Sequence, residues 1–263
     1  MKDFNTTGVC YSKIHYMMDN SHKISDVMNL IERGKYFTLN RPRQYGKTTT
    51  LHFLMEQLKK KEDYLAIRLT FEDVRDVSHQ SDDAFAEMFM VKMKEGFRQV
   101  DNTIYELLQK TQIKGDTLTN LSTAITTITH AANKKLVMLI DEVDASSNYI
   151  SFLRFLAMLR TKYLNRMSDF DKTFHSIILA GVHDIKSLKY KLRNSADAQY
   201  NSPWNIAVDF KVEMSFNPKE IAPMLEQYSE AEDVTMDIPV IAERLYYHTA
   251  GYPFLVSRLC KIV

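Results

Sequence analysis

Glycine and proline are scarce in this chain. Its 263 residues include 7 glycines and 6 prolines, and no internal repeat or low-complexity segment is evident. Because these two residue types punctuate turns and interrupt helices, their scarcity predicts long helices joined by short connections. Apolar residues make up 45% of the chain. That fraction argues against disorder, and the length suits one large α/β domain or one core with a smaller appendage.

An excess of one charge, a set of cysteines and a long apolar run are also missing. The 34 basic and 33 acidic residues leave a formal net charge of +1, which gives no drive toward nucleic acid or an anionic membrane. The two cysteines, Cys10 and Cys260, do not indicate a disulfide framework and fit a reducing cytosol. No apolar run approaches the roughly 18 residues that span a bilayer. Residues 1–19 carry acids and polar groups where a signal peptide has an apolar block. We therefore expect a cytoplasmic protein with no membrane partner.

Short apolar or β-branched runs alternate with helical patterns. The two most apolar runs, 135–142 and 175–182, resemble strands that are buried on both faces. Strands that alternate with helices predict an α/β fold with a parallel sheet covered on both faces. The predicted strands are 35–40, 64–71, 135–142, 175–182 and 205–214, and the predicted helices are 26–34, 47–61, 84–100, 119–133 and 149–164.

The pattern changes toward the C-terminus. Residues 217–228 and 237–253 are expected to form helices with no strand between them. Asn217 suits a helix cap, Pro218 the first helical position, and Glu220 lies in the first turn. This part of the chain therefore predicts a small helical subdomain.

The last ten residues, FLVSRLCKIV, stay apolar to the end. A helix rarely ends its chain in this way. We therefore expect either a fragment or a chain that continues into a further part.

The most specific motif follows the first predicted strand. The residues RPRQYGKT, from Arg41 to Thr48, match the phosphate-binding pattern G-x-x-x-x-G-K-S/T except that Arg41 replaces the first glycine. That glycine mainly eases the turn, so its loss need not abolish binding. The alternative is an ordinary strand–turn–helix connection with a chance GKT. Taken alone, the motif leaves both interpretations open.

The rest of the loop suits a nucleotide and Mg²⁺. Backbone N–H groups and the helix dipole at the start of the following helix attract phosphate. Lys47 is expected to reach the β- and γ-phosphates, Thr48 to bind Mg²⁺, and Gly46 to allow a close backbone approach. Arg43 adds positive charge. The cofactor-binding residues predicted in this loop are Arg43, Gln44, Tyr45, Gly46, Lys47, Thr48 and Thr49.

A second motif strengthens the first. The apolar run 135–142 ends in Asp141 and Glu142, at the carboxyl edge where open α/β sheets bind ligands. Asp141 is predicted to hold Mg²⁺. Glu142 is predicted to be catalytic together with Lys47, as the base that polarises the attacking water. Asp144 is either a further site residue or a helix cap. The alternative is a pair of acids that cap the next turn, but the joint occurrence with GKT favours ATP binding.

Two later segments offer further site residues. The fourth predicted strand ends in LAGVHD, where P-loop ATPases place a polar sensor near the γ-phosphate. His183 and Asp184 are the candidates, and the alternative is a surface histidine and a helix cap. Arg193 lies in a polar stretch and is a candidate arginine finger, in cis or from a neighbouring copy. The alternative is an ordinary solvated arginine.

In these motifs the chain resembles the AAA-like ATPases of the STAND and archaeal-ATPase branch. The resemblance covers essentially the whole chain, and its most specific motifs are RPRQYGKTT and GYPFLV. The loop of that family commonly reads R-P-R-x-x-G-K-T, so the resemblance implies that Arg41 is a family trait. The other segments that carry the resemblance are GVCYSKIHYMMD, LIDEVD, LAGVHDIKSL and NSPWNIAVDF.

The resemblance implies a P-loop NTPase fold of the additional-strand type, with a parallel five-stranded sheet in the order 5-1-4-3-2. It also implies a helical lid with a G-x-P motif, here Gly251 and Pro253, that contacts the nucleotide. Pro253 therefore joins the predicted cofactor-binding residues.

The same resemblance implies three parts. These are an N-terminal strap whose segment Tyr16 to Asp19 lies near the adenine (1–30), a P-loop ATPase core (31–214), and a helical lid (215–263) that stops where a winged-helix region would start. Relatives are often fused to a PD-(D/E)xK nuclease-like domain. The stretch DFKVEM has the acids but lacks a lysine two residues after Glu213, so no nuclease is predicted.

Three functions remain open. The first is an ATP- and Mg²⁺-dependent conformational switch of core and lid, with slow hydrolysis at Glu142. The second is a nucleotide-binding scaffold that barely hydrolyses. The third is a nucleic-acid-handling ATPase of a mobile-element or phage-defence system. Only the family supports this third function, because the basic runs 59–61 and 186–193 are typical of solvated faces. The expected partners are ATP or ADP, with a homo-oligomer or a C-terminal effector domain as further possibilities.

Overall fold

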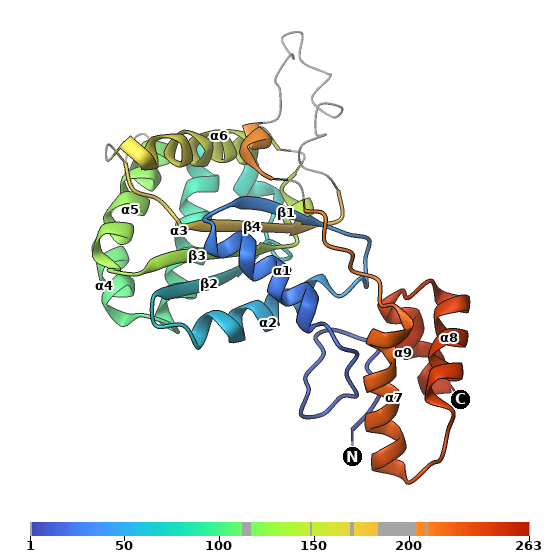
Figure 1. Cartoon of the computed structure of the whole chain (residues 1–263). Coiled ribbons are helices and arrows are strands. Elements are labelled where there is room, and N and C mark those ends of the chain that lie inside the picture. The colour runs from blue at the N-terminus through green and yellow to red at the C-terminus, as the bar shows by residue number, and fades with distance from the viewer. Residues whose placement is uncertain are drawn as a thin grey trace. The chain divides into compact units, whose positions relative to one another are not determined.

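The computed structural model describes residues 2–111, 117–147, 149–168, 171–183, 203–208 and 210–262. These residues form two compact units (Figure 1). Unit 1 consists of Met1–Asn29, Arg41–Leu54 and Lys211–Val263, and unit 2 consists of Leu30–Asn40 and Met55–Phe210.

Unit 2 is built on a parallel sheet with the strand order β1-β4-β3-β2. The strands are β1 (Tyr36–Asn40), β2 (Tyr64–Thr70), β3 (Lys135–Asp141) and β4 (Ser176–Gly181). All six residues of β4 and the last six of β3 are buried, which explains their almost continuous apolar sequence. The sequence prediction is confirmed for these four strands and for their parallel pairing.

The prediction of a fifth strand over 205–214 is wrong for the described residues. Pro203–Ile206 forms a short 3-10 helix, η5. Beyond it, Val208 makes an isolated parallel bridge with Phe37, and its N–H donates to the Tyr36 carbonyl at 2.9 Å. This bridge lies on the edge of β1 that does not pair with β4, which is the place that the order 5-1-4-3-2 assigns to strand five. The 3-10 turn takes up the first part of the segment, so the described sheet has four strands.

One face of the sheet packs against the helices of unit 2 (Figure 1). These helices are α3 (Asp82–Arg98), α4 (Asn102–Lys110), α5 (Thr117–Ala131) and α6 (Ile150–Asn165). Alternate strand residues such as Leu65, Ile67 and Leu69 share a buried cluster with Phe85 and Phe89 of α3. Full burial of one such side chain contributes about 1.5–3 kcal/mol. Helix α4 was not predicted, although Asp101 caps it by accepting the Ile104 N–H at 3.0 Å.

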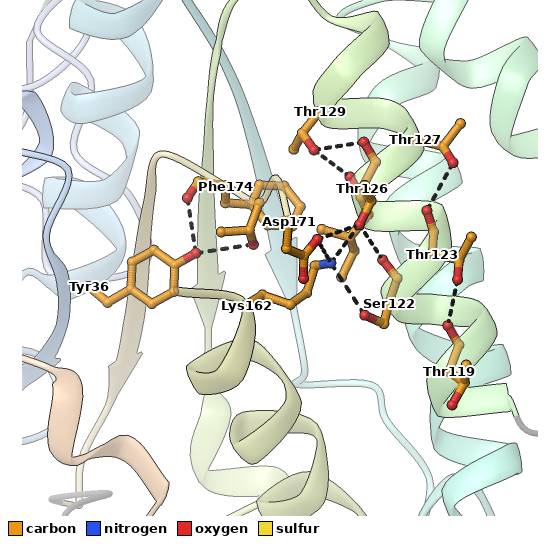
Figure 2. Close-up of polar contacts among 12 residues, drawn as sticks. Tyr36, Thr119, Ser122, Thr123, Thr126, Thr127, Thr129, Lys162, Asp171 and Phe174 are labelled. Carbon is orange, nitrogen blue, oxygen red and sulfur yellow. Dashed lines mark hydrogen bonds and ion pairs between the residues drawn. The ribbon is translucent and has the colours of Figure 1, made fainter. Parts of the chain in front are cut away.

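A buried lysine joins α5 to α6 (Figure 2). Lys162 is 2% exposed, and its ammonium donates to Ser122 Oγ at 3.3 Å, Thr126 Oγ1 at 2.7 Å and Asp171 Oδ1 at 2.7 Å. Burial lowers the pKa of Lys162. The three acceptors around the ammonium compensate part of its loss of hydration. This cluster therefore holds two core helices together.

Unit 1 contains three C-terminal helices, α7 (Pro218–Glu232), α8 (Ile238–Thr249) and α9 (Pro253–Ile262). Their apolar faces enclose Phe4 and Tyr16 from the N-terminal segment. The predicted cap of α7 is confirmed as a full capping box, in which Asn217 and Glu220 each accept the other's backbone N–H. In the described part of the chain, no helix is long and apolar enough to cross a membrane.

Two more helices each have their first residues in unit 1 and their last residues in unit 2. Helix α1 covers Ser21–Glu32 and helix α2 covers Lys47–Lys59. The loop Arg41–Thr48 leads from β1 into α2, as the sequence predicts.

Candidate functional site

The loop Arg41–Thr48 has a backbone suited to anions. Gln44 and Gly46 adopt left-handed conformations, with φ of +59° and +77°. Left-handed residues within a turn direct successive N–H groups into one concavity that attracts anions. The start of the following helix attracts anions as well. A Cβ on Gly46 would meet no atom within 4 Å, so the backbone angle, and not crowding, makes glycine suitable there.

Arg41 explains the missing first glycine. The residue is not among those with positive φ, so this position does not need the freedom of glycine. Its guanidinium donates to the Val212 carbonyl at 2.6 Å. The arginine therefore adds a link between the loop and the segment before α7 that a glycine would lack.

Lys47 closes the loop on itself. It is 6% exposed, and its ammonium donates to the carbonyls of Arg41 at 2.9 Å and Pro42 at 3.0 Å. Thr50 Oγ1 donates to the Gly46 carbonyl at 3.0 Å. From the N-terminal segment, the Cys10 N–H donates to Thr49 Oγ1 at 3.1 Å. The loop is thus held from its own helix and from a segment far away in sequence.

A cavity of about 450 Å³ lies beside this loop. Three parts of unit 1 line it: the N-terminal segment, the loop with the start of α2, and the C-terminal residues around Phe216 and Pro253. Its volume is within the range of small-molecule sites. Of the predicted cofactor-binding residues, those that line the cavity are Gln44, Tyr45, Gly46, Lys47, Thr48, Thr49 and Pro253, while Arg43 does not.

The turn before α9 is closely packed. Gly251 has φ of +71°, and a Cβ there would lie 2.0 Å from the Phe216 carbonyl oxygen. The Gly251 carbonyl accepts the Phe216 N–H at 2.9 Å. Glycine is therefore required at the position that the resemblance singled out, and Pro253, two residues later, lines the cavity.

Asp141 and Glu142 lie in unit 2, at the end of β3. Asp141 is 2% exposed, and its Oδ1 accepts the Glu142 N–H at 3.1 Å. Glu142 is left-handed with φ of +55°. A non-glycine residue held in that region stores about 1–2 kcal/mol of strain, as is common at functional positions.

Arg68 is a residue that sequence reasoning missed. Its guanidinium, on neighbouring strand β2, donates to Asp141 Oδ2 at 2.7 Å. A lone arginine in the otherwise apolar run YLAIRLTF was the available signal. The parallel register, in which Thr70 lies opposite Asp141, brings the two side chains together.

Asp144 joins the ends of two strands. Its carboxylate accepts the N–H of Val182 at 2.5 Å and of His183 at 2.9 Å, directly after β4. A Cβ on Gly181 would lie 2.8 Å from Asp144 Oδ2, so the close approach depends on glycine. The His183 side chain is exposed. Asp184 and Arg193 lie outside the described residues.

The two predicted metal ligands, Thr48 and Asp141, carry oxygen atoms, which are the donors that hard cations prefer. No group of three His, Cys, Asp or Glu side chains that could hold a metal ion is found among the described residues. Mg²⁺ needs no such cage, since it is commonly bound by one or two protein oxygens with phosphates and waters. The Thr48 hydroxyl in unit 1 and the Asp141 carboxylate in unit 2 are each one oxygen donor of that kind.

The chain matches a known protein family, and its fold is similar to solved structures. A family model described as an AAA-like domain matches residues 8–262, and no curated protein matches the chain. The fold is similar to a Walker-type ATPase of Pyrococcus abyssi, with a TM-score of 0.60 and 14% identity over 96% of this chain and 69% of that one.

Two proteins of Aeropyrum pernix, ORC2 and ORC1, are also similar in fold. ORC2, solved in ADPNP–ADP complexes, has a TM-score of 0.55 and 12% identity, with 97% of this chain and 62% of that one covered. ORC1, solved in complex with DNA, has a TM-score of 0.51 and 11% identity, with 94% and 59% covered. At these identities the likeness concerns the fold, and the chain spans less than two thirds of either ORC protein.

Proposed function

The chain belongs to the AAA-like domain family, and from that membership we propose that it binds ATP with Mg²⁺ and hydrolyses it slowly to drive a conformational switch. The observation that carries the proposal is the cavity beside the loop Arg41–Thr48, because seven of the eight predicted cofactor-binding residues line it. The finer placement within the STAND and archaeal-ATPase branch stays a prediction.

In this proposal the phosphates of ATP bind the N–H groups of the loop. Lys47 leaves the carbonyls of Arg41 and Pro42 and donates to the β- and γ-phosphates instead. The exchange costs little, because two neutral acceptors are replaced by charged ones, which bind more strongly. Arg43, which is exposed, adds positive charge near the mouth of the loop.

The adenine occupies the apolar side of the same cavity. Met17, Met18 and Phe216 are among the apolar residues that line the cavity, and the first two belong to the proposed N-terminal strap (1–30). Apolar walls with a few polar groups are typical of sites that bind a planar base. Pro253 supplies the contact from the proposed helical lid (215–263).

Thr48 and Asp141 supply the oxygen ligands for Mg²⁺, either directly or through water. When bound, Mg²⁺ would supply positive charge that offsets the negative charge of the phosphates. Glu142 accepts a proton from the attacking water. Its left-handed backbone sets the direction in which the side chain leaves the main chain. His183 is the proposed sensor, positioned through its backbone N–H on Asp144, and Arg193 the proposed finger.

ATP also explains how a switch would work. One ligand in this cavity contacts the loop, the N-terminal segment and the turn at Pro253 together. Loss of the γ-phosphate weakens the ligand's hold on the loop but not on the apolar wall, so the two nucleotide states differ in how firmly these segments are joined.

A non-hydrolysing scaffold is the second candidate, and the Arg68–Asp141 ion pair favours it. An arginine that already occupies the predicted metal-binding carboxylate competes with Mg²⁺. DNA handling rests on the resemblance and on the DNA complex of one solved neighbour, while the net charge of +1 lends it no support. A homo-oligomer or a C-terminal effector domain remains a prediction.

Calorimetry with ATP and Mg²⁺ tests the proposal, with phosphate release measured on the same samples. Lys47→Ala is expected to weaken ATP binding by about 10- to 100-fold, the value of one or two charged hydrogen bonds. Lys59→Ala is the matched control, because Lys59 lies on the same helix with its side chain 58% exposed and should leave binding unchanged. Binding without turnover would favour the scaffold, and no binding by the wild type would refute both.

A further inference from the structure

The loop Arg41–Thr48 has a second set of contacts on the C-terminal part of unit 1. Alternate loop residues make them. Arg41 donates to the Val212 carbonyl at 2.6 Å, and the Arg43 carbonyl accepts from the Tyr252 hydroxyl. The Tyr45 hydroxyl lies 3.2 Å from Ser215 Oγ. Gln44, Tyr45 and Gly46 also line the cavity.

Tyr252 makes two contacts with the loop. Besides its hydrogen bond to Arg43, its ring meets the Tyr45 ring edge-to-face, with centroids 4.7 Å apart. Burial raises the pKa of Tyr252, and the neighbouring Tyr45 adds to that. The hydroxyl therefore stays protonated at neutral pH and can act as the donor to the Arg43 carbonyl.

The geometry of the peptide bond gives this contact a consequence. A trans peptide is planar, so the carbonyl of Arg43 and the N–H of Gln44 point in opposite directions. A donor that fixes the Arg43 carbonyl on the side of Tyr252 therefore turns the Gln44 N–H to the other side. Gln44 is left-handed, and left-handed loop residues need such outside support.

We propose that Tyr252 is a positioning residue for the loop, which orients the peptide between Arg43 and Gln44 so that its N–H is available to nucleotide phosphates. This inference rests on the proposed function and deepens it. It assigns a role to the middle residue of the G-x-P turn, which acts through the backbone of the loop and not by touching the ligand. It also connects α9 to phosphate binding through one side-chain hydroxyl.

Tyr252→Phe tests the idea, because it removes the hydroxyl and keeps the ring against Tyr45. The probes are ATP, pyrophosphate and adenosine, each titrated by calorimetry into the full chain. We expect the variant to bind ATP and pyrophosphate about 3- to 10-fold more weakly, in line with one lost hydrogen bond. Adenosine binding should be unchanged, since it does not use the loop N–H groups.

Tyr247→Phe is the matched control, because that side chain is 84% exposed. It should match the wild type with all three probes and in thermal stability. Unchanged ATP affinity in Tyr252→Phe would overturn the inference alone. An equal loss for adenosine would also overturn it and would indicate a general effect on the cavity. If the wild type bound none of the probes, the proposed function itself would fail.

Discussion

The guanidinium of Arg68 and the carboxylate of Asp141 form an ion pair at the carboxyl edge of the sheet in unit 2, with 2.7 Å between Nη2 and Oδ2. The aspartate is almost fully buried, whereas the arginine side chain is 29% exposed. The predicted metal ligand is thus held by a cation that the protein itself provides. Any Mg²⁺ that reaches Asp141 must share or displace that partner.

Removal of Arg68 should therefore destabilise the protein, and Mg²⁺ bound with ATP should restore part of the lost stability. We expect Arg68→Ala to lower the free energy of unfolding by about 1–3 kcal/mol, less than for a fully buried pair because the guanidinium is partly solvated. Mg²⁺ with ATP should then stabilise the variant more than the wild type. Denaturant titrations with and without ligand measure both effects.

Arg154→Ala is the control for that experiment. Arg154 pairs with Asp82 at 2.7 Å, but its side chain is 61% exposed, and such surface pairs contribute about 0–1 kcal/mol. Equal losses in the two variants would contradict a special role for Arg68.

Two glycines with similar backbone angles should respond differently to alanine. Gly251 and Gly8 have φ of +71° and +64°, but a Cβ on Gly251 would lie 2.0 Å from the Phe216 oxygen, whereas one on Gly8 would meet nothing within 4 Å. Gly8→Ala should cost about 1–2 kcal/mol from the backbone alone. Gly251→Ala adds a backbone clash and should cost clearly more. Thermal unfolding of both variants measures the difference, and equal melting temperatures would contradict it.

Glu142→Gln should separate binding from turnover. The amide cannot accept the proton of the attacking water, so phosphate release should fall at least 100-fold while ATP affinity stays within about twofold. Glu62→Gln, at an exposed position, is the control and should leave both quantities unchanged. Hydrolysis that survives Glu142→Gln would remove Glu142 from its assigned role.

Unit 2 should lose stability at mildly acidic pH through His79. The ring is 7% exposed and stacks on Tyr149 at 4.0 Å. Its Nε2 lies 3.2 Å from Ser146 Oγ, and its Nδ1 is buried with no partner. Burial lowers the pKa of His79, against an opposing effect of Asp76.

The sign of that effect follows from the lowered pKa. Below the ordinary value near 6.5 the unfolded chain takes up a proton more readily than the folded one, so stability present above that pH falls as the pH drops. His79→Gln should reduce the stability difference between pH 7.5 and pH 5.5 in urea titrations. Burial also lowers the pKa of His175. His175→Gln therefore measures how much of the pH dependence that persists in His79→Gln comes from this second histidine. An unaltered pH dependence in His79→Gln would contradict the prediction.

Local sequence determined much of this protein. The four strands of the sheet were predictable because apolar runs with few polar interruptions suit strands buried on both faces. The loop before α2 and the capping box of α7 were predictable as well, since each depends on residues close together in the chain. The replacement of glycine by Arg41 could be explained only from the structure. The sequence alone does not show whether the backbone at that position must be left-handed.

Contacts between distant segments were decided by the tertiary structure. Arg68 lies 73 positions from Asp141, and Tyr252 lies 209 positions from Arg43. The fifth strand was predicted from its composition, but tertiary packing turned its start into η5 beside β1. Sequence patterns indicate which local conformation a segment prefers. The pairs Arg68–Asp141 and Tyr252–Arg43 depend instead on strand register and on the packing of distant segments. The sequence therefore determined the four strands, the loop and the cap of α7, and the fold alone decided which side chains from distant segments hold them in place.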